Sequence, residues 1–297
     1  MIHRSLLRYG GARYLWWGLA LVAGSILLYS TQGGLNPPKG DTWQGYVLGT
    51  IGALLIVWLT LLGVRKRRYA STLGSVQGWA SAHVYLGLAV VFVATLHCAF
   101  HFHWNVHTLA YVLMCAVVAS GIFGVLAYVY FPRQLSENRA GGARSQLFAE
   151  LLELNKQGRE IGGRCDPNVN AAAKSAIERT AIGGGAITQL FGLDRSWYVR
   201  TDRETGGGKT NLSSNADQQP VIDYVADRVP RAEKRTEAAN LQALLLILCE
   251  RQKTLRRIRR DVQMQGLLNI WLYLHVPLTL ALIAALIVHI LTSFMYW

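Results

Sequence analysis

The feature that most constrains this chain is a long stretch without charge. Residues 69–132 contain no Asp, Glu, Lys or Arg, and neither do the residues after Asp261. A helix needs about 20 predominantly apolar residues to cross a hydrocarbon core of about 30 Å. The first stretch is therefore long enough for two membrane-spanning helices with a hairpin near "HFHWNVHT", and the second for one at 268–296. Helices buried in a soluble core do not need uncharged runs of this length.

Two further apolar segments, residues 14–30 and 44–64, bring the expected number of spans to five. The sequence thus predicts an all-α, polytopic membrane protein whose five helices form a bundle. The expected division of the chain is four spans in residues 1–130, a polar insertion at 131–265 and the fifth span in 266–297.

The insertion at 131–265 is predicted to be mostly helical. Its segments "RSQLFAELLELNKQ" and "NAAAKSAIERT" have helical patterns, the second behind an Asn cap, and the chain from Arg235 indicates one long helix that continues into the fifth span. The segment "SWYVR" indicates a short strand, and "TDRETGGGKTNLSSNADQQP" a loop. Its "GGGKT" is not a phosphate-binding loop, because Arg203 stands where that motif needs glycine.

The net charge of +13 is placed very unevenly along the chain. Every Lys and Arg except Lys39 lies in the N-terminal tail, in residues 65–68 or in residues 133–260. Five spans would place these three segments on one side of the membrane, which is the positive-inside pattern. We therefore expect an integral protein of a bacterial-type inner membrane, with the N-terminus and the insertion in the cytoplasm and the C-terminus outside. Attraction to anionic lipid explains the basic loops without a nucleic-acid partner.

Histidines stand out within the apolar segments, where ionisable residues are costly and usually mark function. His83 and His97 are 14 residues apart, and so are His275 and His289. At about 100° per residue each pair faces one way, with its members roughly 21 Å apart along the helix axis. One span separates the two helices, so they run parallel. His83 is then level with His275 near the inner surface, and His97 with His289 near the outer one.

Two facing imidazoles at each level suit the axial ligation of a haem iron. Zinc would normally require four ligands in a compact tetrahedron. The small residues Gly87, Val90 and Ala94 lie on the His83 side of the helix, where they would let a flat macrocycle approach. The four cysteines form no C-x-x-C or C-x-x-C-H motif, so neither a local iron–sulfur cluster nor a covalent haem is expected. The prediction is two non-covalent b-type haems whose iron ligands are His83, His97, His275 and His289.

Two other interpretations of the histidines stay open: four packing residues with coincidental spacing, or a pathway for a metal ion or proton. His101, His103 and His107 cluster at the outer mouth with Trp104. They could bind propionates, move protons at an outer quinone site, hold a metal or lie in a wet loop. His101 shares the side of His97 and could replace it as a ligand.

Paired histidines 13 or 14 residues apart on two helices resemble the di-haem membrane cytochromes b. The transmembrane domain of ferric reductases and NADPH oxidases looks like this, as does the cytochrome b of quinol–cytochrome c reductases, where a glycine lies between the histidines as Gly87 does here. The gamma subunits of nitrate reductase and formate dehydrogenase are broader analogues. The resemblance covers the spans at about 79–131 and 268–296. These 297 residues contain no flavin or nicotinamide domain and no Pro-Glu-Trp-Tyr quinol motif.

The resemblance implies an electron-transfer subunit that moves electrons across the membrane between a quinone pool or cytoplasmic donor and a redox partner. That partner would be a c-type cytochrome or an iron–sulfur protein. A stand-alone transmembrane reductase of the ferric type is the alternative within redox chemistry. A histidine-lined metal or proton transporter is the alternative from another class.

Overall fold

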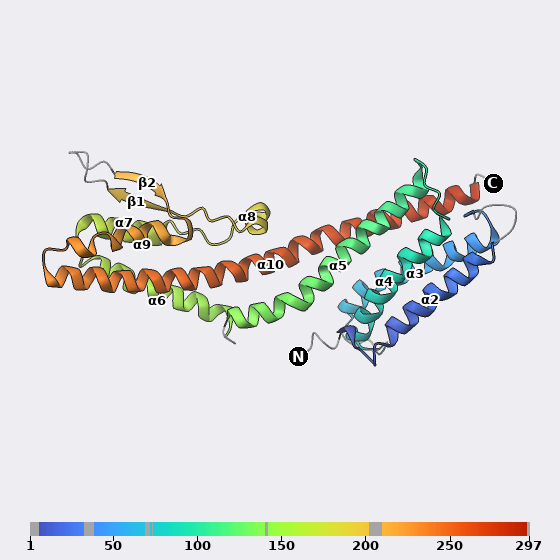
Figure 1. Cartoon of the computed structure of the whole chain (residues 1–297), viewed down its shortest axis with the longest axis horizontal. Helices are drawn as coiled ribbons and strands as arrows, with labels where there is room; N and C mark the ends of the chain where they lie inside the picture. The colour runs from blue at the N-terminus through green and yellow to red at the C-terminus, as the bar shows by residue number, and fades with distance from the viewer. Residues whose placement is uncertain are drawn as a thin grey trace. The chain divides into compact units, whose positions relative to one another are not determined.

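The computed structural model describes residues 6–32, 39–68, 72, 74–139, 142–201 and 210–295. The chain divides into two compact units (Figure 1). Unit 1 comprises Met1–Tyr130 and Trp271–Trp297, and unit 2 comprises Phe131–Ile270. Each unit has a hydrophobic core of its own.

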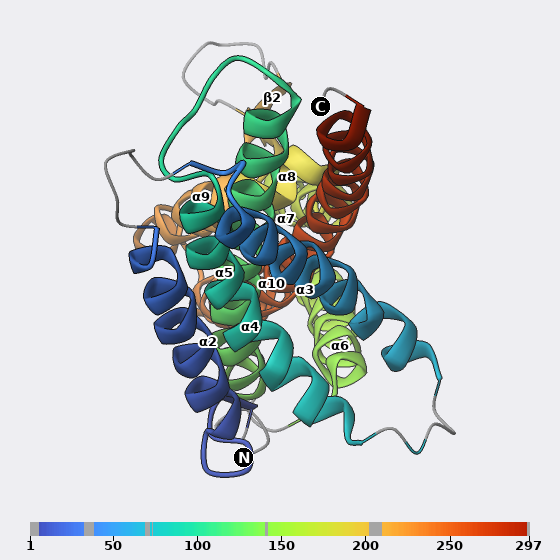
Figure 2. The same ribbon diagram turned by 90° about the vertical axis from the view of Figure 1, so that its right-hand side faces the viewer.

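Unit 1 is built from helices alone in its described residues. They are α2 (Arg13–Ser30), α3 (Trp43–Arg67), α4 (Val76–His97), most of α5 (Val106–Asn138) and the C-terminal part of α10 (Arg235–Met295). Helices α2 and α3 both pack along α4 (Figure 2). Thr42 and Ser75 cap the starts of α3 and α4 by accepting a hydrogen bond from the backbone N–H three residues on.

Four helices of the described residues are long and apolar enough to cross a membrane: α3, α4, α5 and α10. Helix α2 forms where the first span was expected, but it is not one of the four. It has only 18 residues, and it begins with Arg13 and Tyr14, so less of its length is apolar. The prediction of an all-α membrane protein is therefore confirmed at the level of four candidate spans rather than five.

These helices are apolar on their outward faces as well as on the faces that pack inward. Leu54 of α3, Val112 of α5 and Leu280 of α10 are 66%, 56% and 63% exposed. Their inward neighbours Met114 and Leu282 are almost fully buried. Helices that are apolar on every side are typical of a protein whose solvent is lipid.

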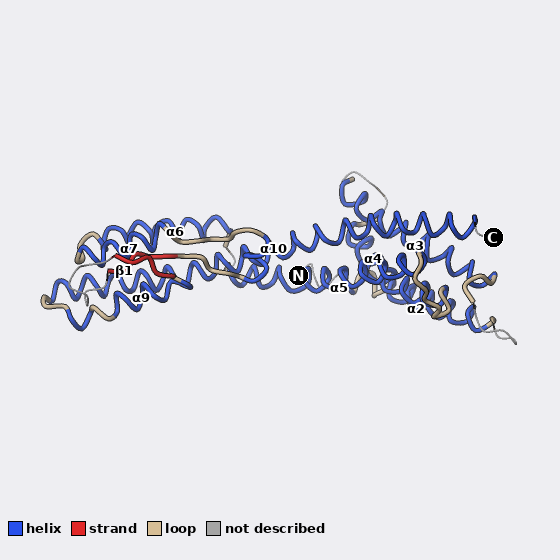
Figure 3. The backbone as a smooth tube through the Cα atoms, turned by 90° about the horizontal axis from the view of Figure 1, so that it is seen from above, coloured by secondary structure: helices blue, strands red, loops and turns tan. Residues whose placement is uncertain are grey.

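Unit 2 is mostly helical and holds both strands found in the described residues (Figure 3). Its elements are the end of α5, α6 (Arg144–Gly162), α7 (Pro167–Glu178), α8 (Ala186–Phe191), β1 (Trp197–Thr201), β2 (Thr210–Ser214), η1 (Ala216–Gln218), α9 (Gln219–Ala226), η2 (Val229–Arg231) and the N-terminal part of α10. Val169, Tyr198, Val221 and Leu244 are central to its core, so α7, β1, α9 and α10 share one apolar interior.

The structure corrects two details of the predicted insertion. Thr210–Ser214, expected in a loop, form β2, which pairs antiparallel with β1 so that Val199 faces Leu212. Strand pairing across the chain outweighs the weak local preference of "TNLSS". Helix α7 is capped by Asp166, with Pro167 in its first turn, rather than by an Asn. The glycines and Lys209 of "GGGKT", and Arg203, lie outside the described residues.

Candidate functional site

The histidines of unit 1 lie in two groups, each built from several helices. In the first group, His97 at the end of α4 and His289 of α10 have ring centres 6.0 Å apart, with their planes at 86°. The Nδ1 atom of His97 is 2.8 Å from the carbonyl oxygen of Gly45 on α3. A Cβ atom on Gly49 would lie 2.7 Å from Cε1 of His97, so a glycine at this position lets α3 approach the ring.

The second group contains His83 of α4 and His275 of α10. His83 Nδ1 is 3.0 Å from the carbonyl oxygen of Leu59 on α3, and His275 Nδ1 is 2.7 Å from Oγ of Ser120 on α5. The two imidazoles are within electrostatic range of each other, and Lys66 is within that range of both. The indole of Trp271 lies beside the His275 ring and donates to the carbonyl oxygen of Ser120 over 2.8 Å.

The partners of these rings determine which nitrogen carries the proton. A backbone carbonyl can only accept, so the Nδ1 atoms of His83 and His97 must donate. Ser120 donates its own hydroxyl hydrogen to the carbonyl oxygen of Val117, 2.7 Å away, so its Oγ accepts from His275. A neutral imidazole protonated at Nδ1 keeps a lone pair at Nε2. Three rings are therefore oriented as metal-ligating histidines usually are, by a hydrogen-bond acceptor at Nδ1.

His289 has a different partner, which the sequence did not reveal. Its Nδ1 atom is 2.5 Å from Nδ1 of His107, near the start of α5, and the ring centres are 4.6 Å apart. His107 therefore belongs to the group of His97 and His289 rather than to the outer loop. His101 and His103 remain in that loop with exposed side chains. Ser120 was missed for the same reason as His107: no local pattern distinguishes a side chain that meets a histidine across more than a hundred residues. Trp271 lies one turn before His275 on α10, and its hydrogen bond to Ser120 of α5 is likewise between residues far apart in the sequence.

Packed apolar side chains lie between the two groups. Val90 of α4, Ile56 of α3, Met114 of α5 and Leu282 of α10 form one buried cluster, and Ala94 packs against it. Gly87, expected to leave room on α4, has Leu59 4.0 Å from the place of a Cβ atom, an ordinary contact distance. Electrostatic interactions at the histidines are strengthened by such surroundings, because the local dielectric constant is low.

The donor set fits a haem better than a bare metal ion. Two imidazoles bound through Nε2 to one iron, at about 2 Å per bond, would have ring centres about 6 Å apart, close to the value for His97 and His289. In the described part of the chain, no group of three or more His, Cys, Asp or Glu side chains is arranged to hold a metal ion. A haem needs only two protein ligands per iron, because the porphyrin supplies the other four nitrogens.

Arg65 and Lys66 lie in the last turn of α3. Arg65 turns inward and donates to the carbonyl oxygens of Arg68 and Gly74, at 2.9 and 2.6 Å, which closes the segment before α4. Lys66 is within electrostatic range of both imidazoles of the second histidine group.

Comparison of the chain with protein-family models, with curated proteins and with solved structures gives no match.

Proposed function

We propose that this chain is a membrane di-haem b-type cytochrome that moves electrons across the bilayer. His97 and His289 would hold one haem, and His83 and His275 the other. Each haem, when bound, supplies a reversible one-electron centre. The chain's own residues hold the imidazoles at fixed orientations and surround them with apolar packing.

The observation that carries the proposal is which nitrogen of each imidazole is hydrogen-bonded and which is free. Gly45, Leu59 and Ser120 each present an acceptor to Nδ1 of one ring. Three Nε2 lone pairs therefore remain, and Nε2 makes no hydrogen bond within the described residues. A neutral imidazole with a free lone pair at Nε2 is the form that ligates a metal.

We infer a topology of five spans, with α2 as the first. Helix α2 packs on α4, where the place of a Cβ atom on Gly18 is 3.2 Å from the carbonyl oxygen of Tyr85. It turns Trp17 and Leu27 outward, at 67% and 68% exposure. With five spans the basic segments share one side, so the N-terminus and unit 2 are cytoplasmic and the C-terminus is outside. The membrane would be of the bacterial inner type.

The donor and acceptor proposed are a quinone pool or a cytoplasmic donor on one side, and a c-type cytochrome or iron–sulfur protein on the other. A ferric-type reductase would use the same two haems but deliver electrons to iron chelates outside. Oxidation of the dithionite-reduced protein by added quinones, compared with soluble ferric chelates, separates these two functions.

The visible spectrum of the purified full-length protein tests the proposal directly. Dithionite reduction should produce a b-type α-band. Replacing His83, His97, His275 and His289 together by Ala should abolish it, because no axial nitrogen would remain. His101→Ala combined with His103→Ala is the matched control, since both side chains are exposed imidazoles near α4. A wild-type protein without the band, or a quadruple variant that keeps it, would refute the haem proposal and favour a histidine-lined transporter.

A further inference from the structure

Helix α8 of unit 2 exposes its apolar side chains and buries a polar one. Ile187, Leu190 and Phe191 are spaced i, i+3 and i+4, so they share one face, and they are 68%, 44% and 68% exposed. The polar residue of the same helix, Thr188, is 8% exposed. A short helix in water would be expected to bury the first three residues and expose the fourth.

Helix α8 lies close to α10 and leaves its apolar face outward. The amide end of Gln189 lies where a Cβ atom on Gly266 would be, so the glycine leaves room for this side chain. Gly192, at φ +62°, ends α8 in the left-handed conformation, with the Gln263 amide 3.2 Å from the place of its Cβ atom. The Gln189 side of α8 and its C-terminal glycine thus lie against residues 263 and 266 of α10, while Ile187, Leu190 and Phe191 remain exposed.

These contacts lie immediately before the apolar part of α10. The last charged residue of the chain is Asp261, and the apolar run begins at Leu267. Gln263 precedes that run by four residues, which is about 6 Å along a helix. The exposed face of α8 is therefore attached to α10 at the point where a membrane-spanning segment reaches the headgroup region.

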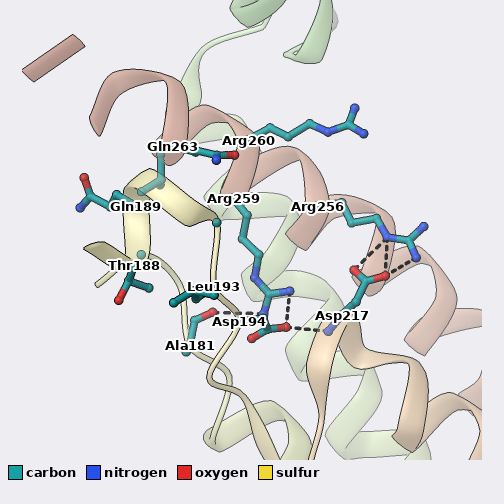
Figure 4. Close-up of a pocket in the computed structure, with 13 residues that line it drawn as sticks. Ala181, Thr188, Gln189, Leu193, Asp194, Asp217, Arg256, Arg259, Arg260 and Gln263 are labelled. Carbon is teal, nitrogen blue, oxygen red and sulfur yellow. Dashed lines mark hydrogen bonds and ion pairs between the residues drawn. The ribbon is translucent and has the colours of Figure 1, made fainter. Parts of the chain in front are cut away.

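Basic side chains flank the same place. Arg256, Arg259 and Arg260 line a cavity of about 220 Å³ together with Thr188, Gln189 and Gln263. Arg259 is bound by Asp194 over 2.7 Å, and Arg256 is paired with Asp217. Arg260 is exposed, extends away from the Arg259–Asp194 pair (Figure 4), and has no carboxylate partner among the described residues. The charge of Arg260 is therefore available to an anion.

We propose that α8 and Arg260 form a docking surface for the anionic phospholipid leaflet. Ile187, Leu190 and Phe191 enter the boundary between headgroups and acyl chains, and Arg260 pairs with a lipid phosphate. A bilayer is the occupant favoured by the chain itself, because the apolar run of α10 begins within a few residues of its contacts with α8. This inference does not rest on the haems, so either can fail without the other.

Photo-crosslinking of the full-length protein in lipid nanodiscs tests the docking surface. Phe191 is replaced by p-benzoylphenylalanine, a conservative change at an exposed site, in discs of phosphatidylcholine and phosphatidylglycerol. Irradiation should add the mass of one phospholipid to the intact protein. The control places the same residue at Leu246, which is 69% exposed and precedes Leu267 on α10 by about 30 Å, and it should give little adduct.

Two outcomes would overturn the proposal. A crosslinked dimer would identify a second copy of this chain as the occupant, and equal lipid adducts at positions 191 and 246 would show that α8 has no special relation to the bilayer. The melting temperature of each variant reports whether it has folded.

The contribution of Arg260 is tested separately in the same nanodiscs. Arg260→Gln in the photo-crosslinking variant should lower the preference for phosphatidylglycerol over phosphatidylcholine adducts about five-fold, since one basic residue near an anionic surface contributes about that factor. Lys174→Gln, which removes an exposed cation from α7, should leave the preference unchanged. An unchanged preference in Arg260→Gln would remove Arg260 from the docking surface.

Discussion

The two units bury polar side chains in opposite ways. In unit 1, His83, His97 and His275 engage Nδ1 and leave Nε2 without a hydrogen bond in the described residues. In unit 2, the guanidinium of Arg251 is 1% exposed and uses three different nitrogens. Its acceptors are Asn155 Oδ1 at 2.7 Å, Gln218 Oε1 at 2.5 Å and Thr180 Oγ1 at 2.6 Å.

The difference distinguishes a structural network in unit 2 from the binding site proposed in unit 1. Burial lowers the pKa of Arg251 to about 10, which still leaves the group charged at neutral pH, and three neutral acceptors bond to it. A buried polar network with its hydrogen bonds made stabilises one conformation. Imidazoles with Nδ1 oriented and Nε2 without a hydrogen bond are what the proposed haem ligation requires.

The largest effect should follow from removing one ligand of the first histidine group. His289→Ala should reduce the haem content from two per chain to one, because His97 alone cannot complete an axial pair while His83 and His275 are untouched. Haem extraction quantified against protein mass measures the ratio. His103→Ala is the control. Retention of both haems in His289→Ala would mean that His107, in contact with His289, is the ligand instead.

Removing the network of unit 2 should affect stability and nothing else. Arg251→Ala leaves three acceptors without their charged donor, Gln218 among them fully buried, and opens a cavity, so the free energy of unfolding should fall by about 3–5 kcal/mol. Chemical denaturation followed by circular dichroism measures the change. Lys253→Ala, two residues on and exposed, is the control. Loss of the haem spectrum in a folded Arg251→Ala protein would contradict the separation between the two units.

Local pattern accounts for the helices but not for the contacts between them. The apolar run at 44–64 predicted α3, observed at Trp43–Arg67, because one feature, the length of apolar sequence, decides a span. The Asp166 cap was missed although "DPN" carries its signal, an acceptor residue followed by proline. Strand β2 has no such signal, since its polar residues form a strand only where β1 pairs with them.

For the candidate site, the sequence spacing could indicate which histidines share a helix face. It could not indicate which residue forms a hydrogen bond with each ring. His107 meets His289 across 182 residues, and Ser120 meets His275 across 155. Such contacts depend on how α5 and α10 pack, which no single segment encodes. The glycine at 49, which lets α3 approach His97, looks in sequence like an ordinary helix-packing glycine.

A smaller effect should follow from removing the hydroxyl group that accepts a hydrogen bond from a histidine ring. Ser120→Ala deprives His275 Nδ1 of its partner, so affinity for the second haem should fall about 10–100-fold while the first is retained. Titration of the apoprotein with haem measures this. Ser30→Ala is a close control, because Ser30 makes the same bond to the carbonyl oxygen three residues earlier and contacts no histidine. An equal loss in both variants would show that helix stability, not the orientation of His275, is responsible.

The smallest effect should come from an ion pair on the surface of unit 2. Arg133 and Glu137 are 2.7 Å apart on α5, with side chains 80% and 61% exposed, so water and salt screen their attraction. Glu137→Gln should leave the melting temperature unchanged within error. Asp261→Asn is the contrast, because that carboxylate is 1% exposed and accepts from Arg139 over 2.5 Å. Its loss should lower the melting temperature clearly, since a guanidinium would be left without its buried partner. Equal shifts in the two variants would mean that ion pairing itself, rather than the burial of one partner, stabilises unit 2.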